Sequence, residues 1–466
     1  MDSEESSVTL LDYVSRLRDK RITVLGIGVS NLPLIRMLAQ AGCRVTACDR
    51  SPREKLAAAD ELESLGVTLN LGDAYLDGIR ADVVFRSPGI RPDLPPIEQA
   101  VRDGAVLTSE MEAFFEVCPC RIVAVTGSDG KTTTTTLISE LLKAAGKQVY
   151  IGGNIGHPLL CESDGMDPDG FAVVELSSFQ LMTMHGRSPD VAVVTNLAPN
   201  HLDVHRSMDE YVDAKRNICC RQGPGCVTVL NRDNELSASF GSSTGGEVRW
   251  FSMHRKVSDG VYNAGEVLTL ARSGAETPLL SVSDIRIPGR HNVENYMAAY
   301  AAVCDWVGPE ILSQVATNFG GVEHRIEFVR ELRGVKYYND SIASSPSRTR
   351  AGLLSFPEKV ILIAGGKDKG VPFDDLGSDV IAHVKKLIVT GLTRDKIRAA
   401  VESRPEYRGD PPILSVEDFR EAVLRASAEA EPGDIVLLSP ACTSFDRFRN
   451  FEERGRFFKQ IVNEME

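Results

Sequence analysis

The sequence has no excess of positive charge. Its 52 Lys and Arg residues are outnumbered by 65 Asp and Glu residues, which gives the 466-residue chain a formal net charge of −13. A field of that sign does not attract a nucleic-acid backbone or an anionic membrane. We therefore expect neither as a partner, and an anionic ligand has to be captured locally, by loops, helix ends or metal ions.

Long apolar runs, targeting segments and a disulfide framework are missing as well. No uncharged apolar run approaches the ~20 residues that a membrane span requires. The beginning, MDSEESSVTL, is acidic and polar and lacks the basic region and apolar core of a secretory signal. The 10 cysteines form no C-x-x-C pair and are too sparse for a disulfide scaffold. These absences predict a soluble, reduced, cytoplasmic protein.

What is present is a regular alternation of two kinds of segment. Short runs rich in Val and Ile, each ending in Gly, Asp or Asn, alternate with longer amphipathic stretches, as is typical of parallel α/β units. At roughly 100–200 residues per domain, the length predicts more than one domain. Three blocks can be separated, and they begin at Arg21, at Arg121 and after Gly320-Gly321. The stretch 231–283, richer in Ser, Gly and Thr, predicts hairpins and loops attached to the middle block.

The middle block opens with a strand, a glycine-containing loop and a helix, in the segment RIVAVTGSDGKTTTTTLISELLKAAG. Gly127 and Gly130 let backbone N–H groups crowd around phosphate oxygens, and the helix N-terminus adds positive potential. Lys131 would neutralise the β- and γ-phosphates, and the Thr132 hydroxyl would sit on Mg²⁺. Val125 occupies the first Gly position of G-x-x-x-x-G-K-[ST], so a shortened variant of this loop is predicted. The alternative is a plain strand-to-helix turn with an incidental surface lysine.

Two later strands of the same block end in residues that can bind metal ions. FAVVELSSFQL places Glu175 at the end of a buried strand, and VAVVTNLAPNHLDVH delivers His201 in the same way. Ligands bind at the carboxyl edge of parallel sheets, so Glu175 is a candidate ligand of Mg²⁺ and His201 of a second ion. Each could instead be a helix cap or a satisfied polar residue. His201 and His205 are four apart, but Leu202 stands where H-E-x-x-H requires Glu, which disfavours zinc.

The first block carries a weaker dinucleotide pattern. Gly26-x-Gly28 follows a strand, and Asp49 ends the next strand, near the ~20-residue offset of a dinucleotide fingerprint. Asn31 occupies the third Gly position, which disfavours a nicotinamide cofactor but leaves a loop that can hold a diphosphate. Asp49-Arg50 and Ser87-Pro88-Gly89 both follow apolar strands, so we expect them at one sheet edge. A turn without any ligand is the alternative.

Taken together, these segments resemble the Mur ligases, the ATP-dependent amide-forming enzymes of peptidoglycan precursor synthesis. TGSDGKTTT is similar in all Mur ligases and in folylpolyglutamate synthases. Three further motifs are similar to the branch that adds D-glutamate: GGNIG at 152–156, ELSSFQL at 175–181 and SPACTSFDRFRNFEERG at 439–455. The resemblance covers the chain from Arg21 onward.

The resemblance implies three domains and a reaction. The implied domains are a Rossmann-like uridine-nucleotide domain over 1–112, a central P-loop ATPase domain with a mostly parallel sheet over 113–321, and a Rossmann-like C-terminal domain over 322–466. The last would close over ATP and the amino acid. ATP would phosphorylate the alanyl carboxylate of UDP-N-acetylmuramoyl-L-alanine, and the amine of D-glutamate would attack the acyl phosphate, giving ADP and phosphate. Two Mg²⁺ ions and a cytoplasmic monomer are implied as well.

The family motifs also assign roles to individual residues of this chain. The implied catalytic residues are Lys131, Lys215 and His201. The implied metal ligands are Thr132, Glu175, His201 and Lys215. The implied ATP-binding residues are Gly127, Ser128, Asp129, Gly130, Lys131, Thr132, Thr133, Asn292, Asn295, Arg325 and Asp340. The implied UDP-substrate residues are Ser30, Asp49, Arg50, Ser87, Gly89, Asn154 and Ser177. The implied D-glutamate residues are Lys369, Ser444 and Phe451.

The role of Lys215 comes from the resemblance alone, because MDEYVDAKRNI matches the family stretch that contains a carbamylated lysine. Only a neutral amine reacts with CO₂, so a depressed pKa is expected for Lys215. Taken by itself, it would be an ordinary lysine on a helix surface. In the same way, helix capping is the alternative for the Asn292 and Asn295 pair, and an exposed ion pair for Arg325 with Asp340.

Two positions depart from the family pattern. Ile342 replaces a substrate-facing lysine, and Asn200 precedes His201 where an Asp is common, which could change how the imidazole is oriented.

Three other functions compete with the implied one. They are an amide ligase for another amino acid, a nicotinamide-dependent oxidoreductase and a nucleotide-switch protein without ligation chemistry. Turnover with lysine or diaminopimelate would favour the first, and dinucleotide binding would favour the second. ATP hydrolysis without an acceptor would favour the third.

Overall fold

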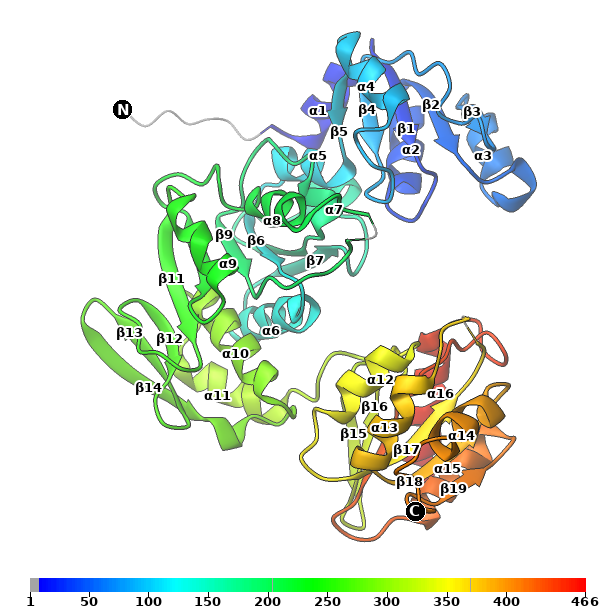
Figure 1. Cartoon of the computed structure of the whole chain (residues 1–466). Coiled ribbons are helices and arrows are strands. Elements are labelled where there is room, and N and C mark those ends of the chain that lie inside the picture. Colours follow the sequence, from blue (N-terminus) through cyan, green and yellow to red (C-terminus); the bar gives the residue numbers. More distant parts are fainter. Residues whose placement is uncertain (1–7, 203, 369) are drawn as a thin grey trace. The chain divides into compact units, whose positions relative to one another are not determined.

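The structure is a computed structural model, and it describes residues 8–202, 204–368 and 370–466. The chain forms two compact units, one of Met1–Val282 with Glu294–Val315 and one of Ser283–Val293 with Ala316–Glu466. The first unit contains a five-stranded and a nine-stranded sheet, and the second contains a six-stranded sheet (Figure 1). Helices alternate with strands along the chain, so the predicted α/β fold with three domains is confirmed. In the described ranges, no helix has the length and apolar character of a membrane span.

The N-terminal sheet is parallel throughout, with the strand order β3-β2-β1-β4-β5. Its strands are β1 (Arg21–Leu25), β2 (Arg44–Asp49), β3 (Thr68–Leu71), β4 (Val83–Arg86) and β5 (Val106–Thr108). The accompanying helices are α1 (Leu10–Leu17), α2 (Asn31–Gln40), the 3₁₀ helix η1 (Arg53–Lys55), α3 (Ala59–Ser64), α4 (Pro95–Arg102) and α5 (Glu110–Val117). The strand order reverses between β1 and β4, and such a switch point is where open α/β sheets bind ligands.

The nine-stranded sheet has the order β14-β13-β12-β11-β10-β9-β6-β8-β7. Its first strands are β6 (Arg121–Thr126), β7 (Val149–Gly153), β8 (Phe171–Glu175), β9 (Val191–Val194) and β10 (Val227–Asn231). They alternate with α6 (Lys131–Ala144), η2 (Leu160–Gly165), α7 (Ser178–Leu181), α8 (Met208–Arg216), α9 (Glu235–Ser239) and η3 (Phe240–Ser242). Leu137, Ile138, Leu141 and Leu142 are all buried, as the helical spacing of apolar residues in α6 predicts.

The remaining strands of this sheet correct one prediction. They are β11 (Glu247–Ser252), β12 (Gly260–Asn263), β13 (Val267–Arg272) and β14 (Ala275–Ser281), followed by η4 (Val282–Asp284), α10 (Arg290–Val303) and α11 (Pro309–Asn318). β12 to β14 are antiparallel hairpins, as predicted, but β11 pairs in parallel with both β10 and β12 and so extends the parallel sheet. Gly260 makes this pairing possible, because a Cβ there would collide with the Trp250 carbonyl.

The six-stranded sheet of the second unit has the order β15-β16-β20-β17-β18-β19, and only β15 is antiparallel to its neighbour. Its strands are β15 (Glu327–Leu332), β16 (Val335–Asn339), β17 (Val360–Gly365), β18 (Val384–Thr390), β19 (Ile413–Ser415) and β20 (Ile435–Leu438). Its helices are α12 (Pro346–Leu353), α13 (Asp374–His383), α14 (Arg394–Glu402), α15 (Phe419–Ala428) and α16 (Phe451–Glu464).

Strand β17 shows how this last sheet is covered on both faces. Ile361 and Ile363 pack with residues of α15 and α16, whereas Leu362 and Ala364 pack with residues of α12, α13 and α14. Successive side chains of a strand point to opposite faces, so a strand between two helical layers needs a continuous apolar run. The sequence VILIAG supplies that run.

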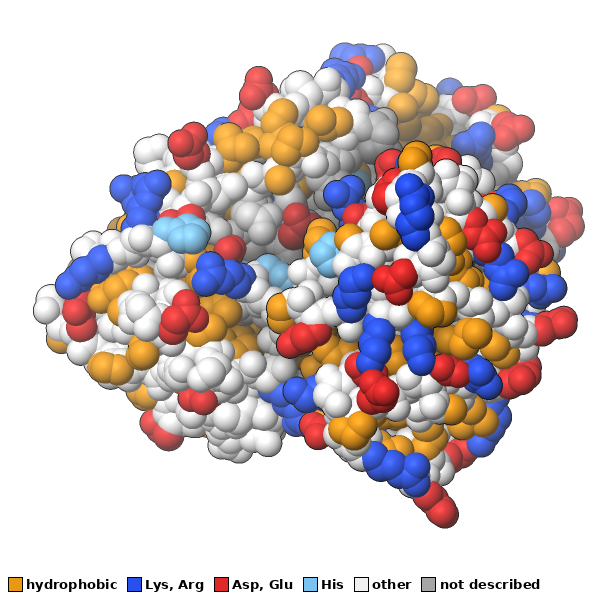
Figure 2. Space-filling view, turned by 60° about the horizontal axis from the view of Figure 1, so that its bottom comes forward, with side chains coloured by type: hydrophobic (Ala, Val, Ile, Leu, Met, Phe, Trp, Pro, Cys, Tyr) orange, Lys and Arg blue, Asp and Glu red, His pale blue; other side chains and the backbone are white. Residues whose placement is uncertain are grey.

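The surface carries charges of both signs. Figure 2 shows Lys and Arg side chains lying among Asp and Glu side chains over the visible face. A mixed surface of this kind produces no extended field of one sign. Capture of an anionic ligand therefore depends on local groups, and the loops at the carboxyl ends of the strands supply them.

Candidate active site

The loop between β6 and α6 depends on two glycines. Gly127 and Gly130 have φ values of 151° and 77°, which residues with a Cβ rarely adopt. A Cβ at Gly127 would collide with Thr195 Oγ1, and one at Gly130 would collide with Asn295 Oδ1. Gly130 is also the N-cap residue of α6 and supplies no capping side chain. The start of α6 therefore has the form of an anion site, with backbone N–H groups and the positive end of the helix dipole.

Residues that follow β9 hold this loop in place. Ser128 N–H donates to the carbonyl of Asn196 at 2.8 Å, and Asp129 N–H donates to Asn196 Oδ1 at 2.9 Å. Thr195 Oγ1 donates to the Asp129 carbonyl at 2.6 Å. Lys131 Nζ donates to the Ser128 carbonyl at 2.9 Å, so its cation lies over the loop that the motif predicts to hold phosphate.

Glu175 is the meeting point of two other predicted residues. Thr132 Oγ1 donates to Glu175 Oε2 at 2.7 Å, and Asn154 Nδ2 donates to Glu175 Oε1 at 2.8 Å. Glu175 is 1% exposed. Gly153 allows this close approach, because a Cβ there would collide with the Glu175 carbonyl. The first turn of α6, the loop after β7 and the end of β8 thus converge on one buried carboxylate.

Lys215 is buried, contrary to its appearance in the sequence as a surface lysine. It lies in α8 with 2% exposure, and its Nζ donates to Thr126 Oγ1 at 3.1 Å and to the Gly127 carbonyl at 2.8 Å. Burial lowers the pKa of Lys215 well below its usual value, and the positive charge of Lys131 lowers it further against the opposing effect of Glu175. Lys215 therefore lies beneath the loop with the electrostatic environment that favours a neutral amine.

The two histidines after β9 occupy different environments. His201 is exposed and has a φ of 54°, and its N–H donates to Asn200 Oδ1 at 2.9 Å. Its ring meets the Phe179 ring edge-on, with centroids 5.1 Å apart. His205 is 2% exposed, lies 2.9 Å from Ser178 Oγ through Nε2 and stacks on Phe179. Burial lowers the pKa of His205, which is a packed structural residue.

Ser177, predicted to contact the UDP substrate, is the N-cap residue of α7. It forms a capping box with Gln180, in which Gln180 N–H donates to Ser177 Oγ at 3.3 Å and Ser177 N–H donates to Gln180 Oε1 at 2.9 Å. Thr133, in the first turn of α6, is buried. Among the described residues, no three His, Cys, Asp or Glu side chains are arranged to hold a metal ion.

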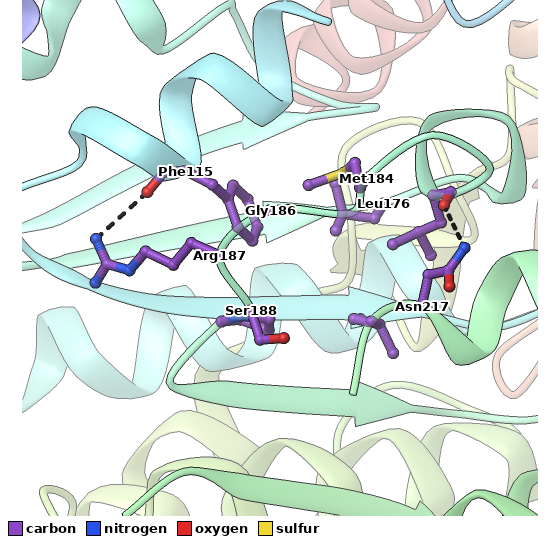
Figure 3. A pocket seen from close by; sticks show the side chains of 10 residues that line it. Phe115, Leu176, Met184, Gly186, Arg187, Ser188 and Asn217 are labelled. Atoms are coloured by element: carbon purple, nitrogen blue, oxygen red, sulfur yellow. Dashed lines mark hydrogen bonds between the residues drawn. The ribbon is translucent and has the colours of Figure 1, made fainter. Parts of the chain in front are cut away.

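A crevice in the same unit is separate from these residues. It is lined mostly by apolar side chains, together with Arg187, Ser188 and Asn217, and none of its lining residues was predicted to bind a ligand (Figure 3). Arg187 Nη1 donates to the Phe115 carbonyl at 3.3 Å, and Asn217 Nδ2 donates to the Leu181 carbonyl at 2.9 Å. The polar groups at its two ends are therefore engaged in holding neighbouring backbone.

In the N-terminal sheet, the predicted UDP-substrate residues lie at the carboxyl ends of β1, β2 and β4 or in the segments that follow them. Asp49 Oδ2 accepts a hydrogen bond of 2.7 Å from Ile27 N–H, in the loop after β1. Asn31, at the missing third Gly position, donates through Nδ2 to the carbonyls of Leu25 and Gly26 at 3.1 and 3.0 Å. Asn31 thus stabilises the loop itself. Of the other predicted residues, Ser30 is the N-cap of α2 and Arg50 directly follows β2. Ser87 and Gly89 lie on the loop after β4.

The predicted ATP residues outside the loop are distributed over both units. Asn295 Oδ1 accepts a hydrogen bond of 3.2 Å from Thr134 Oγ1, and Asn292 Nδ2 donates to the Pro288 carbonyl. Both lie inside α10, so neither is a helix cap. Asp340 is 4% exposed, which excludes an exposed ion pair with Arg325. Burial raises the pKa of Asp340 to about 7, against the opposing effects of Ser439 and Arg325.

The predicted D-glutamate residues follow strands of the C-terminal sheet. Ser444 is 2% exposed and lies in the loop after β20. Phe451 begins α16, and its carbonyl accepts a hydrogen bond of 2.8 Å from Ser341 Oγ. Ile342, one of the two departures, is half-buried, and its N–H donates to the His324 carbonyl. Lys369 lies outside the described residues.

Sequence reasoning missed Arg454, which lies in the second unit and is 2% exposed. Its guanidinium donates to Ser341 Oγ at 3.0 Å, to the Ser341 carbonyl at 2.9 Å and to the Cys442 carbonyl at 3.1 Å. It therefore joins the loop after β16 to the loop after β20. The FEERG motif contains Arg454, but nothing in its spacing identifies the carbonyls that it binds.

The phosphate loop at the carboxyl edge of a parallel sheet defines a P-loop nucleotide-binding protein. Family models match most of the chain: Mur ligase MurD-like, N-terminal domain at 20–109, Mur ligase middle domain at 125–303, and Mur ligase, glutamate ligase domain at 324–442. The chain belongs to the Mur ligase family.

Curated relatives and solved structures agree with this family. The chain is 50% identical over 462 residues to the UDP-N-acetylmuramoylalanine–D-glutamate ligase of Ruminiclostridium cellulolyticum, covering 98% of this chain and 99% of that protein. It is 48% identical over 460 residues to the enzyme of the same name from Clostridium novyi, covering 98% and 99%. The fold is similar to that of UDP-N-acetylmuramate-alanine ligase from Thermotoga maritima, with a TM-score of 0.53, 19% identity and 95% and 99% coverage. It is also similar to UDP-N-acetylmuramoyl-L-alanyl-D-glutamate–2,6-diaminopimelate ligase, with a TM-score of 0.58, 18% identity and 97% and 94% coverage.

Proposed function

We propose that this protein is the ATP-dependent ligase that joins D-glutamate to UDP-N-acetylmuramoyl-L-alanine in peptidoglycan precursor synthesis. The observation that carries the proposal is the convergence of a phosphate loop, a hydroxyl, a carboxylate and a buried lysine within one sheet edge of a Mur ligase. Relatives of about half-identical sequence over nearly the whole length bear the name of this enzyme. The oxidoreductase and nucleotide-switch alternatives do not agree with this family.

The reaction follows from the groups at the loop. The N–H groups at the start of α6 and the Lys131 ammonium would bind the ATP phosphates and stabilise negative charge as the γ-phosphoryl group moves to the alanyl carboxylate. The amine of D-glutamate would then attack the carbonyl carbon of the acyl phosphate. The new C–N bond forms, the C–O bond to phosphate breaks, and the amine loses a proton, leaving an amide, phosphate and ADP.

The residues at Glu175 fit Mg²⁺. Oxygen ligands suit this ion, and the Thr132 hydroxyl already lies 2.7 Å from the Glu175 carboxylate. Thr132 and Glu175 would hold the first ion, and His201 would contribute to a second. When bound, the ions would neutralise phosphate charge.

Lys215 fits the carbamate that the family motif implies. Its amine is buried, its pKa is lowered by burial and by Lys131, and it hydrogen-bonds to Thr126 and Gly127 at the base of the loop. A carbamate would turn this cation into an anionic oxygen ligand, which suits a site that holds divalent metal ions.

We assign the UDP substrate to Ser30, Asp49, Arg50, Ser87, Gly89, Asn154 and Ser177. We assign D-glutamate to Lys369, Ser444 and Phe451, and the nucleoside of ATP to Asn292, Asn295, Arg325 and Asp340. The proposed domains are 1–112, 113–321 and 322–466, and the first boundary falls within α5. We also propose that the protein acts in the cytoplasm as a monomer.

The test is phosphate release from ATP in the presence of UDP-N-acetylmuramoyl-L-alanine. D-glutamate, L-glutamate, lysine, diaminopimelate and no acceptor are compared. Release that requires D-glutamate supports the proposal. Release with another acceptor would retain the ligase chemistry and reject the amino-acid assignment, and acceptor-independent hydrolysis would reject ligation.

A further inference from the structure

A buried arginine outside the predicted site joins the N-terminal sheet to the central one. Arg86 is the last residue of β4, and its side chain is among the largest that are fully buried, with 1% exposure. Its guanidinium makes five hydrogen bonds, and all five acceptors are neutral oxygen atoms. The charge of the nearby Glu112 only partly offsets the desolvation cost of burying this group, so its burial requires an explanation.

One side of this guanidinium holds the loop after β4. Arg86 Nη1 donates to the carbonyls of Ser87, Pro88 and Ile90 at 3.3, 3.2 and 2.6 Å. The loop lies against the first glycine of the N-terminal pattern, because a Cβ at Gly26 would come within 2.9 Å of the Ser87 Cβ. The arginine thus fixes the backbone that carries two of the proposed UDP-substrate residues, Ser87 and Gly89.

The other side of the guanidinium reaches the central sheet. Arg86 Nη2 donates to the Phe179 carbonyl at 2.7 Å and to Thr183 Oγ1 at 3.0 Å. Phe179 lies in α7, shortly after Glu175, and its ring meets the His201 ring. A single planar group therefore connects the substrate loop to α7, the helix that follows the predicted metal ligand Glu175.

A second arginine, Arg91, makes a similar connection between the loop after β4 and the central block. Arg91 Nη2 donates to Glu210 Oε1 at 2.7 Å and to Asp93 Oδ2 at 2.8 Å, and its Nη1 donates to the Val204 carbonyl. Glu210 belongs to the first turn of α8, the helix that carries Lys215. The loop after β4 is therefore attached at both of its ends to helices of the central block and to the segments beside them.

We propose that Arg86 is a positioning residue that fixes the UDP-substrate loop, Ser87–Ile90, relative to the phosphate-transfer groups of the central sheet. This inference rests on the function proposed above. It concerns the UDP substrate alone, because none of the five hydrogen-bond acceptors of Arg86 lies in the ATP loop or in the second unit. Only a guanidinium has the planar set of donors that can serve both sides at once, so lysine is not an equivalent replacement.

The experiment measures steady-state phosphate release for the wild type, Arg86→Lys and Thr183→Val, varying each of the three substrates in turn. We expect Arg86→Lys to raise KM for UDP-N-acetylmuramoyl-L-alanine by about tenfold or more, with KM for ATP and for D-glutamate within about twofold. Thr183→Val removes one acceptor and keeps the charge, and it should shift the same KM in the same direction by a smaller factor. Arg36→Lys is the matched control, since Arg36 forms an exposed bidentate pair with Glu61 in the same domain.

The outcomes separate this inference from the proposed function. If the wild type shows no D-glutamate-dependent release, the proposed function fails first. If the wild type is active and both variants leave KM for the UDP substrate within twofold, the positioning role is wrong. An equal loss for all three substrates would indicate general destabilisation and would also overturn it. Should Arg86→Lys fail to fold, Thr183→Val alone decides by the same KM comparison.

Discussion

Thr132 Oγ1 and Glu175 Oε2 lie 2.7 Å apart, joined by a hydrogen bond from the first turn of α6 to the end of β8. The second carboxylate oxygen is held by Asn154. Both oxygens of this buried group are thus held in place by neighbouring side chains, which is the preorganisation that electrostatic catalysis depends on. A substitution of Glu175 therefore provides a direct test of the proposed metal site.

Glu175→Gln keeps the shape of the side chain and removes its charge. We expect phosphate release to fall by about 10²-fold or more, because a neutral amide is a poor ligand for a divalent cation. The dependence of the rate on Mg²⁺ concentration should also shift to higher concentrations. Glu140→Gln is the control, since Glu140 forms an exposed pair with Lys143 on α6. Unchanged Mg²⁺ dependence in Glu175→Gln would reject Glu175 as a ligand.

Lys131→Ala removes the cation over the phosphate loop. Turnover should fall by about 10³-fold or more, because the charge that develops on the transferring phosphoryl group loses its nearest side-chain cation. Stability should change little, since the Lys131 side chain is not buried. The measurements are phosphate release and the thermal midpoint, with Lys143→Ala on the same helix as control. Near-normal ligation in Lys131→Ala would show that the loop has been misassigned.

Lys215→Ala tests the carbamate. Activity should be lost, and short carboxylic acids such as acetate should restore part of it by supplying oxygen atoms in the vacated space. Lys147→Ala, which removes an exposed lysine, should neither lose activity nor respond to acetate. The absence of rescue, together with full wild-type activity after removal of CO₂, would count against the carbamate.

Much of this site could be predicted because its signals are local. The phosphate loop follows β6 directly, Glu175 ends β8, and His201 lies in the segment that follows β9. Parallel strands bring their carboxyl ends to one edge. The burial of Lys215 could not be derived in this way, since α8 reads MDEYVDAKR, which is mostly polar. The contacts of Arg86 could not be predicted either, because its partners Phe179 and Thr183 lie more than 90 positions away in the sequence.

Asn31 shows a third kind of difficulty. In the sequence, it stands where a dinucleotide fingerprint has its third glycine. In the structure its side chain is 2% exposed and binds the carbonyls of the loop, so it replaces the glycine with a stabilising contact. The sequence motif shows only that Asn31 differs from glycine, whereas the structure shows that its side chain stabilises the loop.

Glu110 provides a prediction about stability that is independent of the active site. It is 5% exposed in α5, where Leu160 N–H donates to its Oε1 at 3.0 Å. Desolvation outweighs this hydrogen bond and raises the pKa of Glu110 to about 7, from its usual value of 4.5. Between these two pH values the folded state binds more protons at this position than the unfolded state.

The contribution of Glu110 to stability is therefore complete below about pH 4.5 and is lost as the pH rises through about 7. Glu110→Gln cannot titrate, so its free energy of unfolding should gain about 1–3 kcal/mol relative to the wild type between pH 5 and pH 8. The measurement is urea unfolding of both proteins across this range, with Glu116→Gln, an exposed change on the same helix, as control. Since other carboxyls titrate equally in all three proteins, a difference that stays constant with pH would show that Glu110 is ionised normally.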